Sequence, residues 1–98
     1  MTRAVRFSEA ATEEFVESAQ YYQDKVYGLG DAFQAEIHQL ALSASEHPER
    51  YPIVGTDVRR AVAKRFPFSL YFRVYESEIF VFSVFHGRRN PKIWQDRT

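Results

Sequence analysis

The sequence predicts an α+β domain in which a two-helix hairpin packs on a small, mainly antiparallel sheet, with the element order β-α-α-β-β-β. Two observations support this fold class. The second half of the chain holds two aromatic and β-branched runs on either side of a short polar turn, and the first half holds two apolar stripes at helical spacing. A chain of 98 residues with 45% hydrophobic content can build one core, so residues 1–98 are expected to form a single domain.

The first strand is expected over residues 3–7, where Val5 and Phe7 alternate with Arg6. Ser8 then fits the N-cap of a helix, because its hydroxyl can accept a hydrogen bond from a free backbone N–H of the first turn. The apolar stripe of this helix recurs at helical spacing and comprises Ala11, Phe15, Ala19, Tyr22 and Val26.

Two glycines separate this helix from the next. Gly28 fits a C-terminal stop, and Gly30 fits a turn. The second apolar stripe comprises Leu29, Phe33, Ile37, Leu40 and Ala44. It ends at Pro48, and the prolines and glycine of residues 47–55 predict a loop.

A second strand is expected over residues 57–65. Val58 and Val62 lie on one side of it, and Ala61 and Ala63 lie on the other. Four basic residues in so short a segment are many for a strand, so here the alternation of apolar residues is the evidence.

The last two strands are predicted over residues 66–75 and 78–85, joined by Glu76 and Ser77. A two-residue turn there would set Tyr75 opposite Glu78 and Phe72 opposite Val81. The period of two then predicts a core face made of Phe68, Leu70, Phe72, Val74, Ile79, Val81, Ser83 and Phe85. The opposite, second face would carry Ser69, Tyr71, Arg73, Tyr75, Glu78, Phe80, Phe82, Val84 and His86. This second face is aromatic where a solvent face would be polar, so we expect something to cover it. The side chains expected to be buried in the core are Phe15, Phe33, Ile37, Leu40, Phe72 and Val81.

Charge is divided between the two halves although the net charge is zero. Residues 8–50 carry nine acidic and two basic side chains, whereas residues 51–98 carry nine basic and four acidic ones. The sheet side is therefore expected to meet an anionic partner, either nucleic acid or an acidic polypeptide.

Several chemistries lack the residues they need. The chain has no cysteine, which excludes disulfides, thiol catalysis and cysteine-based metal sites, and its histidines show no metal-ligand spacing. There is no catalytic Ser/His/Asp pattern, no paired carboxylates and no glycine-rich phosphate loop, so no cofactor is expected. The longest apolar run, residues 79–85, is too short to cross a bilayer, and a cytoplasmic protein without a membrane partner is expected.

The segment His86-Gly87-Arg88-Arg89-Asn90-Pro91 places two guanidinium groups beside a flexible glycine directly after a strand. Arginines in such a position can hold a phosphate or a carboxylate through two parallel hydrogen bonds. They can equally close a strand-end turn by pairing with Asp96 or with acidic residues of the helices. The spacing leaves both interpretations open.

The arrangement from Arg60 to Trp94 resembles the RelE/ParE superfamily of bacterial toxins from type II toxin-antitoxin modules. The helix region, with Gly28-Leu29-Gly30, Phe33 and the proline after the second helix, is similar as well, so the resemblance covers nearly the whole chain. The resemblance rests on Arg65-Phe66-Pro67-Phe68, Tyr71, Arg73-Val74, the acidic turn, the apolar run and the ending His86-Gly87-Arg88-Arg89-Asn90-Pro91. It implies the β-α-α-β-β-β fold, a cognate antitoxin as partner, and one of two targets: DNA gyrase, or mRNA on the ribosome.

The resemblance favours the ParE-like branch, a toxin that inhibits gyrase by protein-protein contact. RelE-like members commonly use a tyrosine near the C-terminus to cleave RNA without metal, and the tail from Pro91 to Thr98 has none. Zero net charge also fits poorly with entry into the ribosome, where basic surface supplies most of the affinity. The alternative, a ribosome-dependent mRNA endonuclease, would use Arg60, Lys64, Arg65, Arg73 and Arg88 to stabilise phosphate charge.

Contact with the antitoxin or the target is expected on the second face and on the segment that follows it. The residues expected there are Tyr71, Arg73, Phe80, Phe82, His86, Arg88, Arg89 and Trp94. Aromatic side chains at alternating strand positions serve a protein interface more often than base stacking, so a protein partner is preferred over RNA.

Overall fold

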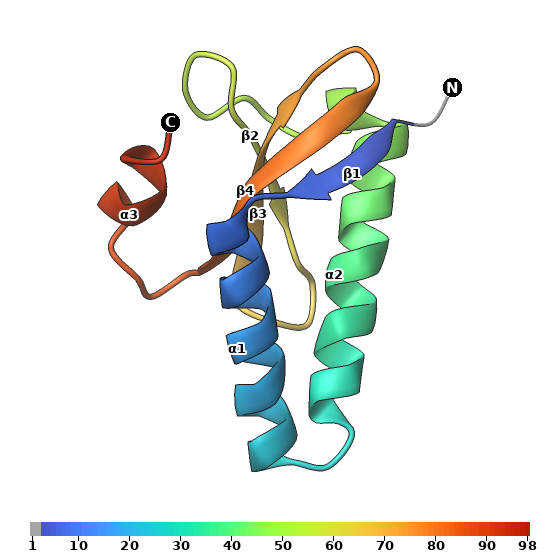
Figure 1. The fold of residues 1–98 in the computed structure, drawn as a ribbon, viewed down its shortest axis with the longest axis vertical. Coiled ribbons are helices and arrows are strands. Elements are labelled where there is room, and N and C mark those ends of the chain that lie inside the picture. The colour runs from blue at the N-terminus through green and yellow to red at the C-terminus, as the bar shows by residue number, and fades with distance from the viewer. Residues whose placement is uncertain (1–2) are drawn as a thin grey trace.

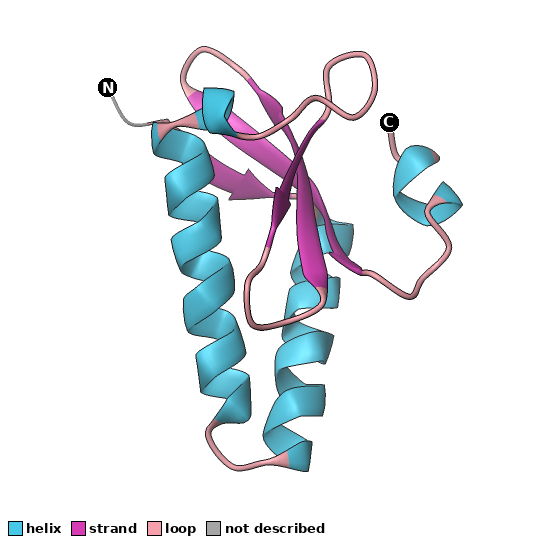
Figure 2. Cartoon of the chain, turned by 180° about the vertical axis from the view of Figure 1, so that it is seen from behind, coloured by secondary structure: helices cyan, strands magenta, loops and turns pink. Residues whose placement is uncertain are grey.

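The computed structural model describes residues 3–98 and has the predicted order of strands and helices, with two short helices in addition (Figure 1). The elements are β1 (Ala4–Phe7), α1 (Glu9–Lys25), α2 (Leu29–Glu46), the 3₁₀ helix η1 (Pro48–Arg50), β2 (Arg59–Val62), β3 (Phe68–Val74), β4 (Glu78–His86) and α3 (Lys92–Gln95). The four strands form one sheet in the order β1-β4-β3-β2, in which β1 is parallel to β4 and the other pairs are antiparallel. The fold class is therefore α+β with a mixed sheet. The long helices α1 and α2 run side by side along one face, and α3 lies apart from them (Figures 1 and 2).

The helical hairpin begins as predicted and differs from the prediction at its tip. The Ser8 hydroxyl accepts a hydrogen bond from the Ala11 N–H at 3.0 Å, which confirms the N-cap. Gly28 lies between the helices with a φ of +85°, in the left-handed region that favours glycine. The turn predicted at Gly30 is wrong, because Gly30 is buried inside α2, where a Cβ would come within 2.5 Å of the Ala19 carbonyl oxygen of α1. The predicted place of Val26 in the apolar stripe is also wrong, because Val26 follows the end of α1 and is exposed.

The main core lies between this hairpin and the sheet. Phe33, Ile37, Phe72 and Val81 are fully buried in it, as predicted, whereas Phe15 and Leu40 are half-buried at its margin. The second strand is shorter than predicted, but its alternation is confirmed. Ala61 and Ala63 are buried in the core, Val58 packs on the second face, and Val62 is exposed at the edge of the sheet.

The predicted hairpin turn is confirmed, but the register changes halfway along β4. The Tyr75 N–H donates to the Glu78 carbonyl at 2.8 Å, and Phe72 pairs with Val81. Tyr71, however, pairs with Ser83, so Phe82 is the extra residue of a β-bulge. An extra residue reverses the facing of every residue beyond it. The predicted faces of the last four residues of β4 are therefore wrong. Ser83 and Phe85 lie on the second face, and Val84 and His86 lie on the helix side.

Candidate functional site

The second face of the sheet carries a small core of its own, which we call the second-face cluster. Its buried members are Val58, Tyr71, Phe82, Phe85 and Trp94, with Val54, Phe80 and Ile93 packed around them. The bulge builds this cluster, because the extra residue puts Phe82 and Phe85 on the same side as Tyr71. Tyr71, Phe82 and Phe85 thus share one face, whereas strict alternation would have placed Phe85 on the other.

The chain covers this cluster with its own C-terminus. The Trp94 ring of α3 stacks on Tyr71, with centroids 4.0 Å apart and planes 13° apart, and the residue is only 8% exposed. Phe85 meets the same tyrosine edge-on at 5.8 Å. Of the residues expected to contact a partner, Tyr71, Phe82 and Trp94 are therefore buried in this structure, and Phe80 is half-buried beneath Arg6. Their role in partner binding stays a prediction.

One carboxylate fastens the C-terminal segment to the rest of the fold. Glu14 of α1 accepts hydrogen bonds from Arg89 at 2.7 Å, from Arg97 at 2.9 Å and from the Val84 backbone N–H at 3.0 Å. The two arginines lie on either side of α3, so this Glu14 clasp holds both ends of the segment. The pairing of Arg89 with a helix acid is one of the two arrangements that the sequence left open. Nothing in the sequence indicated Glu14 or Arg97, because both look like ordinary surface charges.

Arg73 acts as a second fastening point on this face. Its guanidinium lies 3.1 Å from the Asp57 carboxylate and above the Phe82 ring, and it donates to the Thr98 carbonyl oxygen at 3.4 Å. Arg73 is thus paired within the chain, between the loop before β2 and the last residue, and its contact with a partner stays a prediction.

His86 lies on the helix side, where it lines a hollow of about 310 Å³ between α1 and the end of β4. The other walls come from Tyr21, Tyr22, Phe68 and Arg89, together with Glu17 and Ser18. His86 Nδ1 accepts a hydrogen bond from the Arg88 N–H at 3.0 Å. Burial, with a smaller contribution from Tyr21, raises the pKa of the Tyr22 phenol, so this side chain is neutral at physiological pH.

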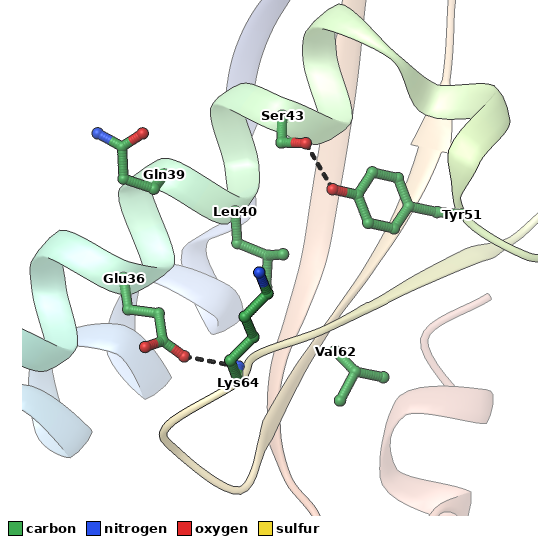
Figure 3. Close-up of a pocket in the computed structure, with 7 residues that line it drawn as sticks. All are labelled: Glu36, Gln39, Leu40, Ser43, Tyr51, Val62 and Lys64. Carbon is green, nitrogen blue, oxygen red and sulfur yellow. Dashed lines mark hydrogen bonds between the residues drawn. The ribbon is translucent and has the colours of Figure 1, made fainter.

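The basic residues named for RNA cleavage lie in two groups. Lys64 and Arg65 follow β2, where the Glu36 carboxylate accepts both of their backbone N–H groups at 2.8 and 2.9 Å. Figure 3 shows the bond to Lys64. The Gly87 N–H donates to the Pro67 carbonyl oxygen, which brings exposed Arg88 to the same end of the sheet. Arg60, which pairs with Tyr71 at the middle of β3, and Arg73, near the far end of this strand, lie on the second face. Arg73 is five residues along the strand from Phe68, roughly 16 Å, so the five side chains do not surround one point.

Among residues 3–98, no group of three or more metal-ligating side chains comes together. None of the described helices is long and apolar enough to cross a membrane.

Comparison with known proteins agrees with the fold. A family model described as "ParE toxin of type II toxin-antitoxin system, parDE" matches residues 5–91. A solved structure titled "Chromosomal ParDE TA system from P. aeruginosa" aligns with a TM-score of 0.69 and 20% identity, over 87% of this chain and 96% of that chain. At that identity, the likeness concerns the fold. No curated protein matches the sequence.

Proposed function

The chain belongs to the ParE toxin family of type II toxin-antitoxin systems, and from this we propose that it arrests growth by inhibiting DNA gyrase through protein-protein contact. The match of the family model over residues 5–91 is the observation that carries the proposal, because it spans α1, α2 and the whole sheet except Ala4. In this proposal a cognate antitoxin neutralises the toxin, and all three proteins meet in the cytoplasm.

The segment after β4 is the region we assign to target contact. Arg88 is exposed, and its side chain takes part in no salt bridge within residues 3–98, whereas Arg89 is occupied by Glu14. A free guanidinium at the start of an exposed turn can pair with a carboxylate of the target through two hydrogen bonds. Arg88 is therefore the residue of the His86–Trp94 segment best suited to contact the target directly.

The alternative function, cleavage of mRNA, has one observation in its favour. His86, Tyr21, Tyr22 and Arg89 line a single hollow, and such side chains can donate or accept protons and stabilise phosphate charge. The separation of Arg73 from Lys64, Arg65 and Arg88 along β3 weakens it, because electrostatic stabilisation requires several basic side chains near one phosphate. Inhibition by contact needs no such convergence.

The two functions differ in what they change in the cell. The protein is induced, and mRNA ends and plasmid topology are mapped in the same culture. Relaxed or cleaved plasmid with intact messages is expected, and new cuts within translated codons with normal supercoiling would refute the gyrase proposal. Arg88→Ala should relieve growth arrest, while Arg50→Ala, an exposed arginine in η1, serves as the matched control.

A further inference from the structure

The loop between β2 and β3, residues 63–67, is fastened to the rest of the fold at several points. The Glu36 carboxylate of α2 accepts the backbone N–H groups of Lys64 and Arg65, and the Phe66 ring is buried in the main core. The loop therefore presents its outer side chains in one arrangement, and a partner that binds there does not have to order it first.

A hollow of about 500 Å³ lies beside this loop, at the end of the sheet where β4 leads into Gly87. Most of its lining residues are apolar, and two of them, Val62 and Pro67, are exposed. Val62 and Lys64 also line a second hollow, of about 330 Å³, between β2 and α2 (Figure 3). Exposed apolar side chains with a polar rim are typical of an association site.

The rim of the first hollow is basic. Lys64 and Arg65 line it, and Arg88 follows Gly87 on its far side. All three basic side chains are exposed, and none of them takes part in a salt bridge within residues 3–98. An apolar side chain flanked by carboxylates would complement such a surface in both shape and charge. We call the part of it on β2 and the loop the β2–β3 patch, which comprises Val62, Lys64, Arg65 and Pro67.

A protein fits the β2–β3 patch better than a nucleic acid does. Proteins that bind single strands stack the bases on accessible aromatic side chains, but on this sheet Trp94 and Tyr71 cover each other. The backbone of a duplex would meet the basic side chains and leave the apolar hollow unfilled. A net charge of zero also gives the chain little long-range attraction to a polyanion.

We propose that DNA gyrase docks on the β2–β3 patch, with an apolar gyrase side chain in the hollow and gyrase carboxylates opposite Lys64 and Arg65. The patch is continuous with Arg88, the residue assigned to target contact, because the Gly87 N–H donates to the Pro67 carbonyl oxygen at 2.8 Å. This inference rests on the proposed function and adds a second contact region, from an earlier part of the chain, to the segment after β4.

The test measures the binding of the full chain to purified DNA gyrase. Lys64→Glu and Arg65→Glu should each raise the Kd by about tenfold or more, because each places a negative charge opposite a carboxylate. Val62→Asp should have a similar effect, because it brings a carboxylate into the apolar hollow. Added salt should weaken the binding of the unaltered chain more than that of Arg65→Glu, which has one attractive charge pair fewer to be screened.

Lys25→Glu and Val26→Asp are the matched controls. They make the same changes at the end of α1, where Lys25 is exposed and Val26 is 58% exposed, close to the 54% of Val62. The Kd of both control variants should stay close to that of the unaltered chain. Circular dichroism establishes that each variant is folded.

The unaltered chain gives a second measurement, which serves where a variant does not fold. Its lysines are Lys25, Lys64 and Lys92, so a reagent that acetylates amines samples three separate places in the fold. Gyrase should slow the acetylation of Lys64 several-fold, because an interface excludes the reagent, and should leave that of Lys25 unchanged.

The outcomes separate the patch from the proposed function. Gyrase binding with Lys64 still acetylated at the rate of the free chain, or with the patch variants and the controls binding alike, would overturn the β2–β3 patch and leave the gyrase proposal standing. If the patch variants lost affinity only for duplex DNA or for the cognate antitoxin, gyrase would be the wrong occupant. Absence of gyrase binding by the unaltered chain would overturn both proposals.

Discussion

Glu14→Gln should detach the C-terminal segment and lower the stability of the whole domain. The Glu14 side chain is 10% exposed and accepts three hydrogen bonds, two of them from guanidinium groups. Glutamine has nearly the same shape, but it brings N–H donors to a position surrounded by donors. A hydrogen bond to a charged group contributes about 1.5–3 kcal/mol to stability when it is shielded from water. The side chains of Arg89 and Arg97 are 41% and 26% exposed, so water can replace part of this contribution. The expected loss in the free energy of unfolding is therefore about 2–3 kcal/mol, or roughly 10 °C or more in Tm.

Trp94 allows the two effects to be measured separately. It is the only tryptophan in the sequence, and it lies stacked on Tyr71, so its fluorescence reports whether α3 is docked. Glu14→Gln should shift the emission to longer wavelength before the main unfolding transition, and urea titration should give the loss of stability. Glu13→Gln changes the same charge at the exposed neighbouring position and should alter neither. Equal stability and unchanged emission in the two variants would refute the assigned role of the Glu14 clasp.

Three further predictions concern the core and the hairpin. Phe72→Ala should cost about 3–5 kcal/mol in urea titration, because the ring is fully buried in the main core, and an unchanged midpoint would contradict the assigned face. Gly30→Ala should lower Tm because the new Cβ would meet the Ala19 carbonyl, whereas Gly55→Ala, with nothing within 4 Å, should leave Tm nearly unchanged; equal values would argue against close helix packing. The raised pKa of Tyr22 means that its stabilising contribution is present below pH 10.0 and is lost as pH rises through the folded-state pKa, so Tyr22→Phe should lose less stability at alkaline pH than the unaltered chain. Identical pH profiles of the two proteins would show that this tyrosine is not the group responsible.

Much of the fold could be predicted because local patterns specify it. Ser8 caps α1 as its hydroxyl suggested, and the turn at Glu76 and Ser77 sets Phe72 opposite Val81. These features involve residues close in sequence, so each depends on spacing that can be read directly. Gly30 differs, because the reason for a glycine there is the close approach of the two helix backbones, whereas a lone glycine near a helix end locally indicates a turn.

The candidate site was less predictable. From Ile79 to Phe85 the chain is apolar except for Ser83, so no alternation was available to reveal the bulge at Phe82. The bulge decides which aromatic residues share the second face and turns His86 toward α1. Glu14 and Arg97 are 83 residues apart, and a salt bridge at that separation leaves no local signal.

The sequence by itself determined the order of elements, the two apolar stripes of the helices and the pairing of β3 with β4, because the period of each pattern is a property of neighbouring residues. Only the tertiary structure decided that β1 joins β4 in parallel and that the C-terminal segment covers the second-face cluster. Both depend on contacts between residues more than ten positions apart. Such contacts form because the assembled core leaves surface there to be covered, and that surface exists only once the helices and the sheet have packed.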